Sequence, residues 1–314
     1  MNAQTYRNDL PQLAGKMCIT DGGLETVFVF QKNVDLPLFA SIDLLTTAEG
    51  QKMLVEYFQP YVDLARERRV GLILDTATWR ASHGWAEQLG HSRDDIRRLN
   101  QLSVDLLNDI RTAYESAETP MVINGVIGPE SDGYNPTHRL GADEAEAYHT
   151  DQVMTFAESA ADMVTAVTMT YADEAVGIVQ ASRKAGIPVA VSFTVETDGR
   201  LPDGTTLREA IETVDFATTN GPAYYMINCA HPSHFEDVLD NGADWTNRIR
   251  GIRANASRKS HAELDESTEL DDGDPVEFGD DYLRLCGVLK NLTVVGGCCG
   301  TDHRHVSEVC RAVA

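Results

Sequence analysis

Three cysteines stand at points where apolar segments of the sequence end. Cys298 and Cys299 lie in the glycine-rich segment 296–301 after one such run, and Cys229 follows the run 224–228. The flanking glycines permit the sharp turn that two adjacent cysteines need to reach one ion, whereas a disulfide between them would be strained. Three thiolates favour Zn²⁺ and leave a fourth position open, as in catalytic sites. We therefore predict that Cys229, Cys298 and Cys299 bind zinc.

The remaining cysteines, Cys18, Cys286 and Cys310, fall inside a predicted strand and two predicted helices. Free cysteine is often a small buried apolar residue, so we expect these three to belong to the core. In a chain of 314 residues with a polar N-terminal segment, we expect free thiols or metal ligands in place of disulfides.

A zinc ion with three thiolate ligands points to thiol chemistry. A metal deprotonates a thiol that binds to it, and a thiolate is a much stronger nucleophile than a thiol. A substrate thiolate held at the open position can attack an electrophilic carbon without a separate strong base. The cysteines therefore indicate a catalytic role in addition to metal binding.

The elements that must position these residues alternate between short apolar runs and longer helical patterns. Most of the apolar runs are continuous, which is typical of parallel strands covered on both faces. We predict eight strands, at Met17–Thr20, Gly71–Thr76, Met121–Val126, Met163–Thr168, Val189–Thr194, Tyr224–Asn228, Ile249–Ala254 and Leu292–Gly296.

The intervening helical segments carry recognisable end signals. Thr46 and Glu49 form a capping pattern, Ser92 precedes a charged first turn, and Gly186 follows a cationic last turn. Eight strand–helix pairs predict an α/β fold, a (β/α)₈ TIM barrel that forms a single domain over residues 1–314. Residues 1–15 are expected to be an N-terminal extension, and the acidic stretch 257–279 a long loop after the seventh strand.

The catalytic face of such a barrel lies at the carboxyl ends of its strands. There the sequence reads Asp21-Gly22-Gly23 after the first strand, Asn228-Cys229 after the sixth and Gly-Gly-Cys-Cys-Gly-Thr after the eighth. In these motifs, and in Gly125–Pro129 and Asp198-Gly199, the chain resembles the homocysteine S-methyltransferase family from about Cys18 to Val313.

The resemblance implies roles for particular residues. It implies that Cys229, Cys298 and Cys299 bind Zn²⁺ as the catalytic centre, and that Asp21 helps to hold the amino group of homocysteine. It also implies that the backbone of Gly22 and Gly23 approaches the substrate, and we assign Asn228 to the same substrate site.

One position departs from the family pattern. Where the family usually carries a glutamate that helps to bind the substrate amine, after the fourth strand, this chain has Thr168. A neutral hydroxyl cannot replace a carboxylate as a charge partner. Thr168 is assigned to the substrate site, and either Glu196 or another nearby acid compensates, or the acceptor is not homocysteine.

These observations predict a zinc-dependent S-methyltransferase of methionine biosynthesis. It would transfer a methyl group from an onium donor (S-methylmethionine, S-adenosylmethionine or a betaine) to homocysteine, giving methionine. Trp79, Trp85, Tyr134 and Tyr171 fall on or near the loops that could meet a cationic donor. Two alternatives remain: another thiol or selenol acceptor, or a zinc- and thiol-binding module that needs a separate methyl-donating partner.

Composition excludes some partners. The formal net charge of −23 argues against nucleic acid, which requires a basic surface. No apolar run reaches the length of a membrane span, and the polar N-terminal segment lacks the apolar core of a signal peptide, so we expect a cytoplasmic protein. The expected partners are a small-molecule thiol acceptor and a cationic methyl donor; the sequence sets no oligomeric state.

Overall fold

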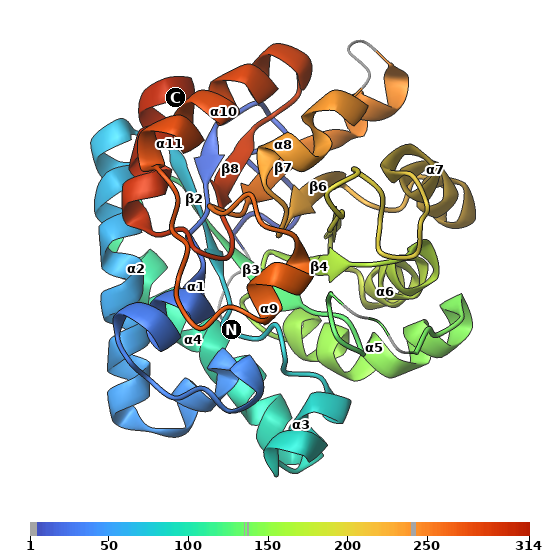
Figure 1. Ribbon diagram of the computed structural model, residues 1–314. Helices are drawn as coiled ribbons and strands as arrows, with labels where there is room; N and C mark the ends of the chain where they lie inside the picture. The colour runs from blue at the N-terminus through green and yellow to red at the C-terminus, as the bar shows by residue number, and fades with distance from the viewer. Residues whose placement is uncertain (1–4, 135, 137, 240–242) are drawn as a thin grey trace.

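The computed structural model describes residues 5–134, 136, 138–239 and 243–314. Within these residues eight parallel strands form a closed barrel in chain order, and β1 completes it by pairing with β8 (Figure 1). The strands are β1 (Cys18–Ile19), β2 (Gly71–Asp75), β3 (Met121–Ile127), β4 (Met163–Met169), β5 (Val189–Phe193), β6 (Tyr224–Asn228), β7 (Ile249–Ala254) and β8 (Val294–Gly297).

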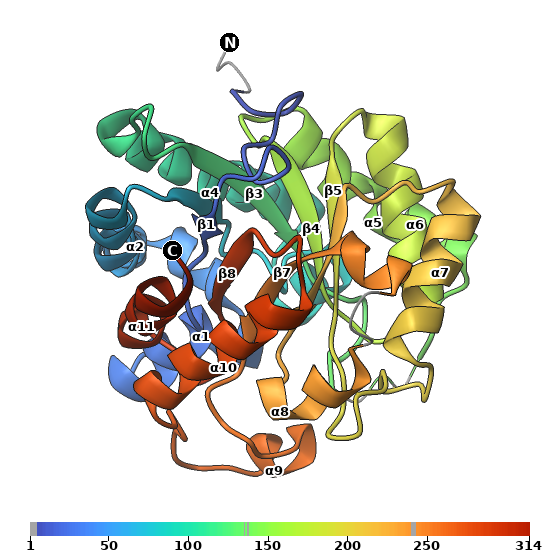
Figure 2. The ribbon, with the colours of Figure 1, turned by 90° about the horizontal axis from the view of Figure 1, so that it is seen from above.

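Helices surround the barrel and link consecutive strands (Figures 1 and 2). They are α1 (Leu24–Thr26), α2 (Ala48–Arg68), α3 (His83–Leu89), α4 (Arg93–Tyr114), α5 (Ala142–Ala157), α6 (Ala172–Ala185), α7 (Leu207–Thr218), α8 (Pro232–Phe235), α9 (His261–Asp265), α10 (Pro275–Val288) and α11 (His303–Val313). The predicted (β/α)₈ barrel is confirmed. Among the described residues, no helix has both the length and the apolar character that a membrane span requires.

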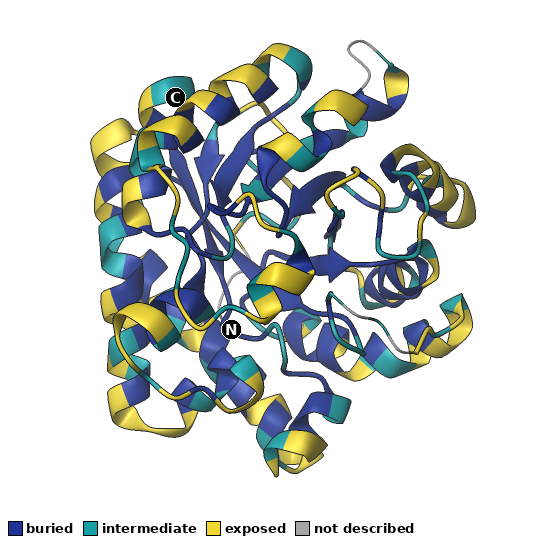
Figure 3. Cartoon of the chain, in the orientation of Figure 1, coloured by how far each residue is buried: buried dark blue, intermediate teal, exposed yellow. Residues whose placement is uncertain are grey.

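The strands are buried because both of their faces are covered. Every residue of β2, β3, β4, β5 and β6 is buried, and the exposed residues lie mainly on the outer helices (Figure 3). This explains the continuous apolar runs in the sequence, since a strand covered on both faces has no polar alternation. In β7 the exceptions are Arg250 and Arg253, which are only partly buried.

The helix ends follow the sequence signals, with one correction. Ser92 caps α4 by accepting a hydrogen bond from the backbone N–H of Asp95 (3.1 Å), and Gly186 ends α6 with a φ of 70°. The cap of α2 is Thr47 and not Thr46, because Thr47 accepts from the Gly50 N–H while the Thr46 hydroxyl donates to a carbonyl in the preceding turn.

The acidic stretch 257–279 is more ordered than the predicted long loop. It contains α9, and α10 begins at Pro275, within the stretch expected to be a loop. The Asp274 carboxylate caps α10 by accepting from the backbone N–H groups of Val276 and Glu277. Proline at the first helical position, directly after an aspartate cap, is a favourable helix start that the high acidity of this stretch concealed.

The described part of the N-terminal segment closes one end of the barrel. Leu10 is buried in a cluster with residues from the interiors of several strands, including Ile73 and Val122, and the Gln12 side chain is fully buried. Figure 2 shows this segment at the end of the barrel opposite to α8 and α9. The segment is therefore a plug for the bottom of the barrel and belongs to its core.

Replacing Leu10 with alanine should lower the free energy of unfolding by about 2–3 kcal/mol, because it leaves a cavity beneath the strands. The matched control is Leu13→Ala, since Leu13 is 38% exposed and its truncation should cost less than about 1 kcal/mol. Urea unfolding followed by circular dichroism measures both values. Equal, small changes in the free energy of unfolding of the two variants would contradict the conclusion that the N-terminal segment belongs to the core.

Candidate metal centre

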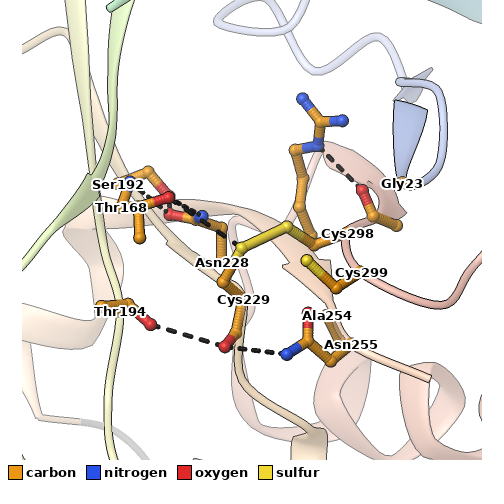
Figure 4. Close-up of a disulfide and its surroundings, with 12 residues drawn as sticks. Gly23, Thr168, Ser192, Thr194, Asn228, Cys229, Ala254, Asn255, Cys298 and Cys299 are labelled. Carbon is orange, nitrogen blue, oxygen red and sulfur yellow. Dashed lines mark hydrogen bonds between the residues drawn. A yellow bond between two sulfur atoms is a disulfide. The ribbon is translucent and has the colours of Figure 1, made fainter. Parts of the chain in front are cut away.

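The three cysteines predicted to bind a metal come together at the mouth of the barrel. The Sγ atoms of Cys229, Cys298 and Cys299 all lie within 4.8 Å of one another (Figure 4). Two sulfur ligands of a tetrahedral zinc are about 3.8 Å apart, given a Zn–S distance near 2.3 Å. The three cysteines are therefore close enough to share one ion.

Two of these cysteines form a disulfide. Cys229 is bonded to Cys298, with their Cα atoms 5.4 Å apart, while Cys299 is a free thiol. The expectation of free thiols is thus wrong for this pair in this structure. The reason is geometric: sulfurs that converge on one metal position, with Cα atoms at this separation, are also within disulfide range. The pair can bind a metal only after reduction, because the ligand is the thiolate.

The remaining cysteines behave as predicted in two cases of three. Cys18 and Cys310 are buried, whereas Cys286 is only partly buried. Burial raises the pKa of both Cys18 and Cys310 to about 12, so both thiols stay neutral in the core.

Two residues of the site adopt a left-handed backbone where their strands end. Cys229 has a φ of 55° and Thr168 a φ of 62°. For a β-branched residue such as threonine this conformation is unusual, and it coincides with a register shift between β4 and β5 after Ala166. Strained backbone of this kind clusters at functional sites, and here it turns both side chains toward the barrel mouth.

The glycines after β1 are needed for close packing against the turn after β8. A Cβ on Gly23 would stand 2.5 Å from the carbonyl oxygen of Cys298, and one on Gly22 would stand 2.7 Å from that of Thr301. The Gly23 N–H donates to the same Thr301 carbonyl (3.0 Å). No side chain fits here, so Gly22 and Gly23 hold the first loop against the two-cysteine turn.

The carbonyl of Cys229 is fixed by three side chains. Asn255 Nδ2 donates to this oxygen at 3.0 Å, and the Thr194 hydroxyl lies 3.5 Å away (Figure 4). His261 Nε2 lies 2.6 Å from the same oxygen. The other ring nitrogen of His261 contacts Glu196 at 3.1 Å. The helix α9 therefore supports the Cys229 turn.

Asn228 connects the strand ends on the other side of the cysteines. Its Nδ2 donates to the Thr168 hydroxyl (2.8 Å), and its Oδ1 accepts from the Thr168 N–H (3.0 Å) and from the Ser192 hydroxyl (2.6 Å). The Thr168 hydroxyl lies 3.9 Å from the sulfur of Cys229. Asn228 thus orients Thr168, and both are tied to the cysteine site.

Asp21 already has cationic and hydrogen-bonding partners. Arg253 contacts it at 2.5 Å and also pairs with Asp75, while the Tyr57 hydroxyl donates to Asp21 at 3.0 Å. Burial raises the pKa of Asp21 to about 7; Arg253 and Tyr57 lower it, and Asp75 raises it. Burial likewise raises the pKa of Asp75, and Arg253 lowers it.

A cavity of about 400 Å³ opens above these residues. Every residue predicted for the site lines it: Asp21, Gly22, Gly23, Thr168, Asn228, Cys229, Cys298 and Cys299. The size is within the range of small-molecule sites. The structure thus brings the predicted residues together around one space.

The aromatic residues predicted near the donor divide into two groups. Trp79 and Tyr134 line the cavity, whereas Trp85 and Tyr171 do not. The Tyr134 hydroxyl lies 3.3 Å from Cys299 Sγ, and its ring stacks on His261 with centroids 4.2 Å apart. Burial raises the pKa of Tyr134 well above its usual value, so the phenol is neutral at physiological pH.

The charged residues of the cavity that sequence reasoning missed include Glu25, Asp75 and Arg253. Asp75 and Arg253 lie near the carboxyl ends of their predicted strands. This position is a usable signal, because a buried charge is costly unless it has a partner and because the catalytic face of a barrel lies at these strand ends. Glu25 stands only two residues after the Asp-Gly-Gly motif. Glu196, suggested as a compensating acid, does not line the cavity and contacts His261 instead.

Comparison with known proteins identifies the family of the chain. The family model for homocysteine S-methyltransferase matches residues 18–313. The chain belongs to this family. It is therefore an enzyme of the homocysteine S-methyltransferase type, and the resemblance drawn from the sequence motifs is confirmed.

Solved structures give the same fold. The homocysteine methyltransferase MmuM from Escherichia coli in its metallated form has a TM-score of 0.72 and 16% identity, covering 94% of this chain and 96% of that one. Its oxidised form has a TM-score of 0.73 and 19% identity, covering 96% and 98%. A search of curated proteins gave no match. At this level of identity, the likeness to MmuM shows the shared barrel.

In this homocysteine S-methyltransferase family member, Arg253 should be required for stability in a pH-dependent way. Replacing Arg253 with methionine leaves two buried carboxylates unpaired, which should cost about 3–5 kcal/mol at pH 8. The pKa values of Asp21 and Asp75 then rise further above their unfolded values near 4. A group with a raised folded-state pKa loses stability as pH rises through that pKa, so the deficit should shrink toward pH 5.

The control for this prediction is Arg250→Met on the same strand, since Arg250 has no ion pair among the described residues. Chemical denaturation of both variants at pH 5 and pH 8 measures the difference. A pH-independent loss for Arg253→Met, or an equal loss for the control, would count against the buried ion cluster.

Proposed function

We propose that this chain is a zinc-dependent S-methyltransferase that moves a methyl group from an onium donor to homocysteine and forms methionine. One observation carries the proposal: three cysteine sulfurs within 4.8 Å of one another face a 400 Å³ cavity at the mouth of the barrel. Three sulfur ligands with an open side are the donor set of catalytic zinc. Membership of the family supports the reaction type.

The chain's own groups would prepare the site as follows. Once reduced, Cys229, Cys298 and Cys299 would hold Zn²⁺, which when bound keeps an acceptor thiol deprotonated at neutral pH. Burial raises the pKa of the Cys299 thiol, and the hydrogen bond with Tyr134 lowers it. The neutral Tyr134 phenol can donate to the Cys299 sulfur and limit its charge.

The methyl transfer itself is a direct displacement. The acceptor sulfur forms a bond to the methyl carbon while the bond from that carbon to the donor's onium atom breaks, and the donor leaves with that electron pair and without its positive charge. Leu264 and Leu270, from the segment that contains α9, contribute to the cavity walls. Walls of this kind exclude water, which would otherwise solvate the thiolate and slow its attack.

The donor's cation needs a surface that attracts positive charge without hydrogen bonds. The rings of Trp79 and Tyr134 line the cavity, and aromatic faces attract onium groups. The same cavity is lined by carboxylates from the acidic segment, among them Asp265 and Asp271. This combination favours S-methylmethionine, S-adenosylmethionine or a betaine as the donor.

The direct test is zinc content together with methyl transfer. After reduction and dialysis against zinc, the protein should contain about one zinc per chain and methylate homocysteine with at least one of the three donors. A strong chelator should abolish transfer, and zinc should restore it. Transfer that continues at the full rate after the zinc has been removed would contradict the proposal.

Individual cysteines provide a sharper test. Cys298→Ser should weaken zinc binding and lower kcat/KM by at least about a hundredfold, because serine is a poor zinc ligand. Cys286→Ser is the matched control, since Cys286 is a partly buried free cysteine in α10 that does not line the cavity. The control should keep its zinc and its activity; equal zinc loss in both variants would exclude a specific site.

A second acceptor class is favoured by two observations. Thr168 supplies a neutral hydroxyl where a carboxylate was expected, and Asp21 is already paired with Arg253. Both features suit a thiol or selenol that lacks an α-ammonium group. Competition between homocysteine and its desamino analogue 4-mercaptobutanoate decides between the classes: faster methylation of the analogue would favour the second.

A further inference from the structure

Four carboxylates outside the acidic segment 257–279 line the cavity, and Glu25 differs from the other three. Asp21 and Asp75 share Arg253, and Asp132 pairs with Arg80 at 3.0 Å. Glu25 has no ion pair among the described residues. The negative charge of Glu25 is therefore available to a cationic ligand.

The carboxylate of Glu25 is held in a fixed orientation. It is partly buried, and the Ser41 hydroxyl donates a hydrogen bond to its Oε1 at 2.7 Å. A buried or half-buried carboxylate without a charged partner is costly, so its presence beside a cavity points to a ligand.

The backbone around Glu25 is tied to the two-cysteine turn. The hydroxyl of Thr26 accepts a hydrogen bond from the Gly300 N–H (3.1 Å), and Gly23 packs against the carbonyl of Cys298. Glu25 also contributes to the electrostatic field at the Cys299 thiol. A molecule whose sulfur reaches the cysteines is therefore beside Glu25.

We propose that Glu25 binds the α-ammonium group of the thiol acceptor and so takes the role that Thr168 cannot perform. The inference rests on the proposed function, because it assumes that the acceptor's sulfur meets the three cysteines. It makes Glu25 a specificity-determining residue: it selects an amino-acid thiol over a thiol that lacks the amine.

The chemistry of the two substrates decides which cation Glu25 binds. A primary ammonium donates hydrogen bonds, and a charge-assisted bond to a carboxylate is strong and directional. A fully alkylated onium group has no hydrogen to donate and is better recognised by aromatic faces such as those of Trp79 and Tyr134. Glu25, oriented by Ser41, thus suits the acceptor's ammonium and not the donor's onium.

The test compares two thiols that differ only in the amine, homocysteine and 4-mercaptobutanoate. Isothermal titration calorimetry of the reduced, zinc-loaded protein measures the Kd of each. The wild-type protein should bind homocysteine about ten- to a hundredfold more tightly, as expected for a charged hydrogen bond. Glu25→Gln, which keeps the shape of the side chain and can still accept from Ser41, should remove this preference and leave the Kd of 4-mercaptobutanoate unchanged.

Glu266→Gln is the control for the loss of one negative charge, since Glu266 is an exposed carboxylate of the acidic segment that does not line the cavity. It should keep the wild-type preference. A preference retained by Glu25→Gln, an equal weakening of both thiols, or no preference in the wild-type protein would each overturn the inference.

The same samples separate this inference from the proposed function. Selective binding that depends on Glu25, without methyl transfer from any onium donor, would contradict the function and support the role of Glu25. Methyl transfer to homocysteine with no dependence of its Kd on Glu25 would support the function and overturn the inference.

Discussion

The site depends on the close approach of two loops that lie far apart in the sequence. The backbone of Gly22 and Gly23, after β1, packs directly against the carbonyls of Cys298 and Thr301, after β8. Closure of the barrel makes this contact, since β1 and β8 are neighbours only in the closed sheet. A side chain at either glycine would force the loops apart, so two residues without side chains set the position of two of the three sulfurs.

A second constraint is the arrangement of buried charge. Arg253 lies between Asp21 and Asp75 and leaves neither carboxylate unpaired, whereas Glu25 has no ion pair among the described residues. This division changes the interpretation of Asp21. Its carboxylate is part of a buried cluster that joins β1, β2 and β7, and contact with a substrate would have to compete with Arg253. The charged groups of the cavity therefore have separate structural and binding roles.

Much of the fold could be predicted from the sequence, because most strands are continuous apolar runs and most helices carry caps such as Ser92 and Gly186. The cysteines could be placed at one rim because the carboxyl ends of parallel strands meet there. The disulfide between Cys229 and Cys298 could not be predicted, since it depends on distances between β6 and β8. The role of Arg253 was also hidden, because its partners come from two other strands, and Glu25 has no signal beyond its place near the Asp-Gly-Gly motif.

The central claim concerns the ligands of a single ion, and X-ray absorption spectroscopy at the zinc edge tests it most directly. In the reduced, zinc-loaded protein, the account predicts three sulfur neighbours at about 2.3 Å and a fourth sulfur after addition of homocysteine. The Cys298→Ser substitution should remove one sulfur from the shell. A shell made of nitrogen and oxygen, or one that does not change when homocysteine is added, would contradict the account.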